Sequence, residues 1–88
     1  MKIIRNAIAG TMESSDLIVT VLPSVGLNID IQSPVIKQFG DSILKSTKEV
    51  AAGLGVTDAS IMVDDHGALD CTIRARVETA LLRAAEED

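Results

Sequence analysis

The chain has almost no aromatic residues: its 88 residues include one phenylalanine, Phe39, and neither tryptophan nor tyrosine. Proteins that bind single-stranded nucleic acid stack the bases on aromatic side chains, so this chain offers little for that contact. Basic residues are also in the minority, with 8 Lys and Arg against 13 Asp and Glu, and they form no dense cluster. Phosphate binding needs a basic surface, so we expect no nucleic-acid partner. The net charge of −5 instead favours contacts with basic patches on partner proteins.

Long hydrophobic runs and paired cysteines are missing as well. No apolar run approaches the ~20 residues that span a bilayer, and the first ten residues lack the continuous apolar segment of ~7–15 residues typical of a secretory signal. We therefore expect a cytoplasmic protein without membrane association. The single cysteine, Cys71, cannot form an internal disulfide, and an isolated cysteine more often packs as a small apolar residue than reacts.

The residues needed for self-contained catalysis are scarce. His66 is the single histidine, and the chain contains no G-x-S-x-G, G-x-G-x-x-G or G-x-x-x-x-G-K motif. Asp64, Asp65 and Asp70 lie near His66 and could be drawn as a metal or acid–base site. Their spacing matches neither a calcium loop nor paired zinc histidines. A polar turn between a strand and a helix explains them better, so we expect no catalytic residue and no metal ligand.

Hydrophobic periodicity predicts four strands and two helices. Residues 7–12, 16–23, 27–32 and 59–65 have strand character, and 27–32 alternates so regularly that one face should be wet. Residues 33–55 and 68–88 each carry an apolar stripe at helical spacing. In the first helix we expect Ser33 as N-cap and Pro34 at the first helical position. The two stripes are expected to include Ile36, Phe39 and Ile43, then Leu69, Ile73 and Val77.

This β-β-β-α-β-α order predicts a single α+β domain over residues 1–88. The simplest arrangement is a two-layer sandwich, in which a mixed or antiparallel four-stranded sheet has both helices on one face. If the strands flanking the first helix run parallel, that helix makes a right-handed crossover. The acidic residues 86–88 oppose the dipole of the second helix, which predicts fraying at its end.

The predicted turn between the first two strands holds two adjacent serines, Ser14 and Ser15, between Glu13 and Asp16. Serine is a common turn residue because its hydroxyl bonds nearby backbone groups. Exposed turns are also where enzymes modify side chains. A serine without a local base needs a transferase to accept a phosphodiester, and the two flanking carboxylates would repel an incoming phosphate.

Three segments carry a specific resemblance: A-I-A-G-T-M-E-S-S-D (7–16), V-I-K-Q-F-G-D-S-I (35–43) and V-D-D-H-G-A-L-D-C-T-I-R-A-R-V-E-T-A-L-L-R-A (63–84). On these residues the chain resembles the small acyl carrier, or gamma, subunits of bacterial citrate lyase. The family attaches a 2'-(5''-phosphoribosyl)-3'-dephospho-CoA prosthetic group, through a phosphodiester, to the serine of A-G-T-x-E-S-x-D. By this resemblance Ser14 is the attachment residue. The family usually has glycine where this chain has Ser15, and a turn that prefers glycine often requires a positive φ.

The resemblance further implies a carrier without catalytic residues of its own. The thiol of the group is acetylated, and the alpha subunit exchanges acetyl for citryl. The magnesium-dependent beta subunit then cleaves the citryl carrier to oxaloacetate and acetyl carrier. A separate prosthetic-group transferase loads the carrier. Tethering gives the thioester a high local concentration at both active sites. We expect the acidic residues near the turn to help dock these partners: Glu13, Asp16, Asp64 and Asp65.

Two other functions remain compatible with the sequence. One is the carrier subunit of malonate decarboxylase, which uses the same type of prosthetic group. The other is a small ligand-binding regulatory module, which would leave Ser14 unmodified and contain a saturable pocket.

Overall fold

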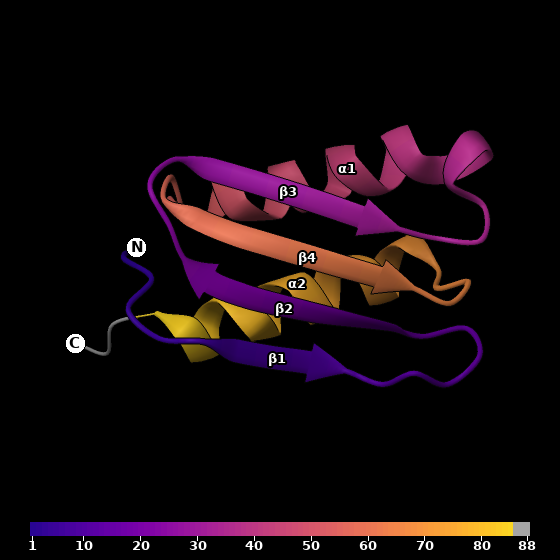
Figure 1. Ribbon diagram of the computed structural model, residues 1–88, viewed down its shortest axis with the longest axis horizontal. Helices are drawn as coiled ribbons and strands as arrows, with labels where there is room; N and C mark the ends of the chain where they lie inside the picture. Colours follow the sequence, from indigo (N-terminus) through magenta and orange to yellow (C-terminus); the bar gives the residue numbers. More distant parts are fainter. Residues whose placement is uncertain (86–88) are drawn as a thin grey trace.

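The computed structural model describes residues 1–85 and contains a four-stranded sheet and two helices (Figure 1). The elements are β1 (Ala7–Gly10), β2 (Leu17–Pro23), β3 (Leu27–Gln32), α1 (Ile36–Gly53), β4 (Ala59–Asp65) and α2 (Asp70–Ala84). Strands β3 and β4 have the bounds expected from the sequence, and β1 and β2 differ from expectation by one or two residues at an end.

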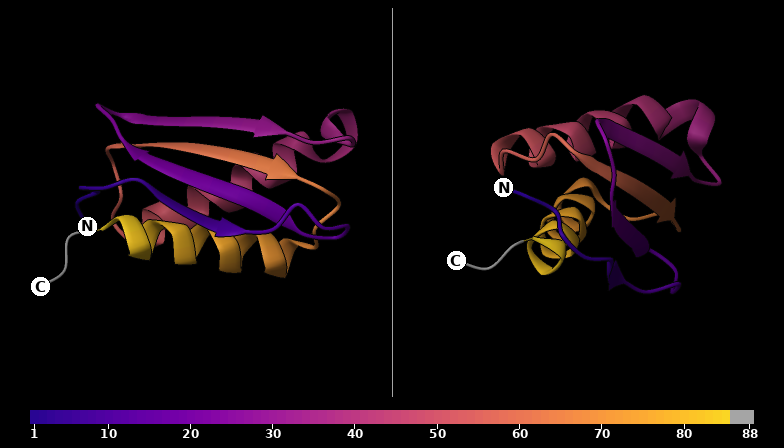
Figure 2. Two further views of the ribbon diagram at one scale, coloured as in Figure 1. Left: turned by 60° about the horizontal axis from the view of Figure 1, so that its bottom comes forward. Right: turned by 60° about the vertical axis from the view of Figure 1, so that its left-hand side comes forward.

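The sheet is mixed, with the strand order β1-β2-β4-β3. β2 runs antiparallel to both β1 and β4, whereas β3 and β4 are parallel and are joined through α1. The two helices lie side by side on one face of the sheet, and the other face is open (Figure 2). This arrangement confirms the predicted α+β two-layer sandwich.

The core lies between the sheet and the helices. Alternate side chains of the central strands β2 and β4 point into it, and α2 covers them with its own apolar stripe. The fully buried side chains of these three elements include Leu17, Val19, Val21, Ile61, Val63, Val77 and Leu81. Among residues 1–85, neither helix combines the length and the apolar character that crossing a membrane requires.

Both helices begin later than the sequence predicted. The N-cap of α1 is Val35, not Ser33, and it makes no side-chain capping bond. The Ser33 hydroxyl instead donates to Asp65 Oδ2 at 2.8 Å and accepts the Val35 N–H at 3.2 Å. The buried carboxylate on β4 therefore uses the hydroxyl that was expected to cap the helix. α2 starts at Asp70 and ends at Ala84, and the fraying predicted for 86–88 lies outside the described residues.

The predicted apolar stripes are wrong at the first turns of both helices. Ile36, Phe39 and Leu69 are 44%, 54% and 70% exposed, although the stripes were expected to face the core. Figure 1 shows the reason for α1: its first turn extends beyond the end of β3, so no strand lies beneath it. Cys71 is likewise exposed on the first turn of α2, not packed in the core.

Candidate functional site

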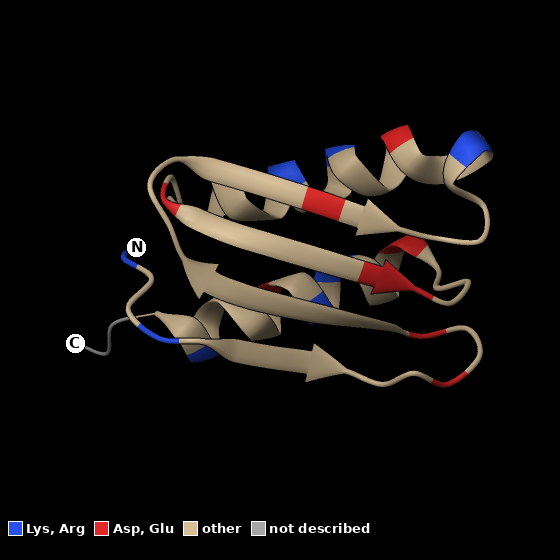
Figure 3. Cartoon of the chain, in the orientation of Figure 1, with Lys and Arg blue, Asp and Glu red and all other residues tan. Residues whose placement is uncertain are grey.

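The loop between β1 and β2, residues 11–16, lies at the end of the sheet where β4 finishes (Figure 1). Ser14 and Ser15 are both exposed there. Within residues 1–85 the Ser14 hydroxyl has no hydrogen-bond partner. Figure 3 shows acidic segments gathered at this end of the sheet. The loop thus presents a free hydroxyl in acidic surroundings.

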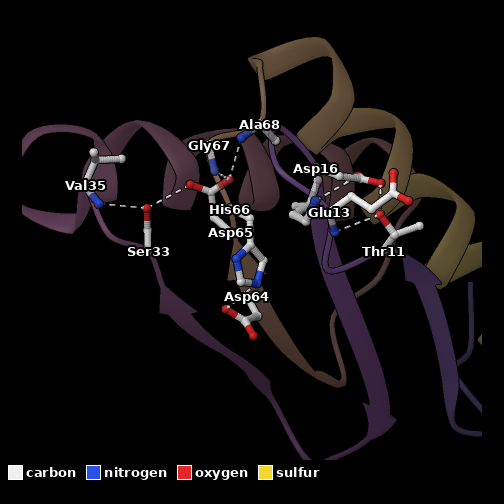
Figure 4. Close-up of polar contacts among 11 residues, drawn as sticks. Thr11, Glu13, Asp16, Ser33, Val35, Asp64, Asp65, His66, Gly67 and Ala68 are labelled. Carbon is white, nitrogen blue, oxygen red and sulfur yellow. Dashed lines mark hydrogen bonds and ion pairs between the residues drawn. The ribbon is translucent and has the colours of Figure 1, made fainter.

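Asp16 fixes the shape of this loop. Its Oδ2 accepts the Thr11 hydroxyl at 2.7 Å and its Oδ1 accepts the Leu17 N–H at 2.8 Å. The Thr11 hydroxyl also accepts the Glu13 N–H at 3.2 Å (Figure 4). These bonds join the two ends of the loop around Ser14, so the serine is held on an ordered turn.

Arg76 of α2 closes the same site from below the sheet. Its Nε lies 3.1 Å from Asp16 Oδ1 and a terminal nitrogen lies 3.0 Å from Oδ2, a bidentate pair across 60 positions of sequence. Bonds from the Thr11 hydroxyl, Arg76 and the Leu17 N–H lower the pKa of Asp16 to about 2. The Asp16 carboxylate is therefore engaged within the chain: it is not a free docking group, and its charge is compensated beside Ser14.

A second support comes from the loop that follows β4. The Ser15 N–H donates to the His66 carbonyl at 2.8 Å, and the His66 N–H donates to the Asp16 carbonyl at 2.9 Å. These bonds extend the β2–β4 ladder one step beyond the Leu17–Asp65 pair. The serine loop and the β4–α2 loop consequently form one unit.

Asp65 holds the β4–α2 loop in place. Its side chain is 2% exposed, and its Oδ1 accepts the N–H groups of Gly67 and Ala68 at 3.2 and 2.9 Å (Figure 4). The expectation that Asp65 docks a partner is therefore corrected, because this carboxylate is buried and its oxygens bond within the chain. Asp64 points to the open face of the sheet, where it is 46% exposed and lies 3.5 Å from His66 Nε2. Glu13 is exposed on the serine loop.

The backbone at two positions of the hairpin requires unusual φ angles. Ser15 has a φ of 65°, in the left-handed region that glycine adopts more easily, so the positive φ expected at this position is present. Gly10 has a φ of 103°, and a Cβ at this position would lie 1.8 Å from the Leu17 carbonyl oxygen. Both angles allow the chain to turn tightly into and out of the serine segment.

Sequence reasoning did not find Arg76 or Thr11 as parts of this site. Arg76 directly precedes Val77 of the buried stripe, so a position at the edge of that stripe could have been read from the helical spacing. Its partner could not, because the contact with Asp16 depends on how α2 lies under β1 and β2. Thr11 was visible in the A-G-T-x-E-S-x-D motif but had been given no role.

The sequence of this chain matches a known protein family and several known proteins. A protein family described as malonate decarboxylase delta subunit (MdcD) matches residues 4–84. The citrate lyase acyl carrier protein of Enterobacter sp. (strain 638) is 57% identical over 88 residues, covering 99% of this chain and 91% of the relative. That of Cronobacter sakazakii (strain ATCC BAA-894) is 53% identical, covering 98% and 90%. The chain belongs to the citrate lyase acyl carrier protein family.

A solved structure also shares the fold of this family member. In the crystal structure of a Pseudomonas malonate decarboxylase hetero-tetramer in complex with malonate, one chain superposes with a TM-score of 0.67 at 18% identity, covering 92% of this chain and 84% of that one. At this identity the likeness extends to the fold alone. It shows that the sandwich is found in a subunit of a multi-chain enzyme.

Proposed function

We propose that this protein is the acyl carrier subunit of a citrate lyase and that Ser14 carries its 2'-(5''-phosphoribosyl)-3'-dephospho-CoA group. Family membership supports the carrier role, and the exposed, clamped serine loop supports the attachment site. The relatives named for citrate lyase favour it over the malonate decarboxylase carrier, whose solved relative is 18% identical.

The residues around Ser14 fit a phosphodiester. The free hydroxyl lies on a loop that also carries Asp16, and the Asp16 carboxylate is already paired with the Arg76 guanidinium. This pairing reduces the repulsion that an incoming phosphate would otherwise meet. When bound, the group supplies a thiol that holds an acyl chain as a thioester. The protein's part is to hold Ser14 on a rigid hairpin and to present it to other subunits.

The proposed partners are the alpha and beta subunits of citrate lyase and the transferase that loads the carrier, all in the cytoplasm. Of the four acidic residues expected to dock partners, Glu13 and Asp64 have exposed side chains, so they are the proposed docking contacts. Both would favour a basic surface on the partner.

Intact-mass spectrometry and peptide mapping test this function directly. The protein is purified from cells growing on citrate that express the chain with the transferase. We expect a mass increase equal to the prosthetic group, mapped to Ser14, and its loss in Ser14→Ala but not in Ser15→Ala. Modification of Ser15 would move the site and keep the function. An unmodified chain in cells with active citrate lyase would overturn the proposal and favour a regulatory module.

A further inference from the structure

A groove of about 480 Å³ opens between the first turns of α1 and α2. This volume falls within the range of about 300–1,000 Å³ that is typical of small-molecule sites. Its walls come from both helices and from the β4–α2 loop. The lining side chains are mainly apolar and include Val35, Phe39, Ile43, Ala68, Leu69 and Ile73.

The groove contains large apolar side chains that the fold leaves uncovered. Phe39, the single aromatic residue, is 54% exposed, and Leu69 is 70% exposed. Leu69 is also the N-cap of α2 and Val35 is the N-cap of α1, and neither helix has a side-chain capping bond. Leu and Val are among the poorest N-cap residues, whereas Ser or Asp would stabilise the helix start by about 1 kcal/mol. Helix stability therefore does not explain these two residues, and a bound apolar group would.

The groove is joined to the serine loop through the β4–α2 loop. The His66 carbonyl accepts the Ser15 N–H at 2.8 Å, and the next two residues, Gly67 and Ala68, line the groove. The serine loop and the starts of both helices lie at the same end of the molecule in Figures 1 and 2. The residue after Ser14 is therefore hydrogen-bonded to the residue that directly precedes the groove wall.

The charge of the lining selects which part of such a group can enter. Asp65 and Asp70 contribute carboxylates, and the lining includes no Lys or Arg. Phosphates are therefore disfavoured. The start of α2 lacks a side-chain capping bond, so its first backbone N–H groups are donors that suit neutral carbonyl acceptors. The start of α1 offers fewer donors, because the N–H groups of Ile36, Gln38 and Phe39 already donate to backbone carbonyls. A neutral chain of amides and methylene groups ending in a small acyl thioester matches both properties.

We propose that this groove binds the neutral, amide-containing end of the group carried on Ser14, with its acetyl thioester, while the phosphates stay outside. The inference rests on the proposed function. Because the chain is tethered, its effective concentration at the groove is in the millimolar range, so a weak site suffices. Binding here would shield the acetyl thioester between visits to the other subunits.

The test compares amide and methyl chemical shifts of the apo and acetylated holo proteins by NMR, after mass spectrometry has confirmed loading. We expect shifts at Val35, Phe39, Ala68 and Leu69 in addition to residues 11–16. Leu69→Ser should abolish the groove shifts without unfolding the protein, since serine is the better N-cap. Leu82→Ser is the matched control, because Leu82 is a 49% exposed leucine near the other end of α2. It should leave the shifts unchanged.

Hydrolysis of the acetyl thioester gives a second readout. A group bound about nine-tenths of the time reacts about tenfold more slowly, since only the released fraction meets solvent. We expect Leu69→Ser and Phe39→Ala to remove this protection and Leu82→Ser to retain it. Loaded protein whose shifts stay within residues 11–16, and whose hydrolysis is the same in all variants, would overturn the groove assignment and leave the carrier function intact. Groove shifts that appear only when partner subunits are added would equally overturn it, and would make the groove a protein contact. Failure of loading would instead count against the proposed function.

Discussion

At the scale of single residues, the hairpin that carries Ser14 depends on two backbone angles. Ser15 adopts a φ of 65° and Gly10 a φ of 103°. A non-glycine residue in the left-handed region costs roughly 1–2 kcal/mol, while the extra freedom of glycine in the unfolded chain costs roughly 0.5–1 kcal/mol. The balance of these two costs at each position therefore predicts whether a substitution raises or lowers the free energy of unfolding.

Replacing Ser15 by glycine should stabilise the protein. Glycine relieves the strain of the positive φ, and the difference between the two costs is about 0.5–1 kcal/mol in the free energy of unfolding. Urea denaturation followed by circular dichroism measures this difference. Ser14→Gly is the control: the positive φ belongs to Ser15, so glycine at 14 should destabilise slightly. A loss of stability in Ser15→Gly would show that the left-handed backbone is not strained.

Replacing Gly10 by alanine should destabilise the protein by more than its φ alone explains. Gly26→Ala is the matched control, with a φ of 75° and no atom within 4 Å of a new Cβ. The control should lose about 0.5–1 kcal/mol, which is the cost of the angle less the gain from removing the freedom of glycine in the unfolded chain. Gly10→Ala should lose about 1–3 kcal/mol more, because its Cβ meets the Leu17 carbonyl oxygen at 1.8 Å. Equal losses in the two variants, measured by denaturation, would contradict the close approach.

At the scale of elements, the strands followed from the sequence and the helix starts did not. The alternation in 27–32 and the β-branched run in 59–65 are local signals, and both strands have the predicted bounds. The first turn of α1 carries the same helical stripe as the rest of the helix. Whether a stripe residue is buried, however, depends on whether a strand reaches beneath it. For Phe39 none does, so a predicted core residue lies on the wall of a groove.

The candidate site could be predicted in part for the same reason. The exposure of Ser14 on a turn and the positive φ at Ser15 were predictable from a short segment, because both depend on the local chain. The pairing of Asp16 with Arg76 joins a hairpin to a helix and depends on the packing of the whole sandwich. Asp65 is another example: its place on the inward face of β4 decides that it is buried, and the acidic sequence around it suggests the opposite.

The Asp16–Arg76 pair predicts how stability varies with pH. A carboxylate whose pKa is lowered in the folded state stabilises the fold at pH above its unfolded pKa, near 3.8. That contribution disappears as the pH falls toward the folded pKa of about 2. Arg76→Gln should raise the pKa of Asp16 and weaken the pH dependence between these two values. Thermal unfolding at a series of pH values measures it.

The control for this experiment is Asp16→Asn. In that background Arg76→Gln should have little further effect on the pH dependence, since the titrating partner is gone. We also expect Arg76→Gln to slow loading of Ser14 on the order of tenfold, because the loop loses its fixed geometry. Arg74→Gln should load at the normal rate, since Arg74 pairs with Asp70 and Glu49 instead. Equal loading of both arginine variants would show that the pair does not position Ser14.

At the scale of the whole molecule, the sandwich places its functional features at one end. The serine loop, the end of β4 and the starts of both helices lie together, while the β2–β3 turn lies at the opposite end (Figure 1). Ser14, the exposed acids and the proposed groove can therefore be presented to a partner in one approach. Asp64, on the open face of the sheet, also lies at this end of the molecule, near the end of β4.

Charge reversal at Asp64 tests whether partners approach this end. Asp64→Lys should slow association of the loaded carrier with the alpha and beta subunits several-fold at low salt, since complementary charge mainly sets the on-rate. The difference should shrink at high ionic strength, where exposed charges are screened. Glu78→Lys is the control, because Glu78 is exposed on α2 away from the start of that helix and the change in net charge is the same. Stopped-flow association, with loading of Ser14 checked by mass, separates docking from modification. Equal slowing in the two variants would mean that only the net charge matters and that the β4 end is not where the partners dock.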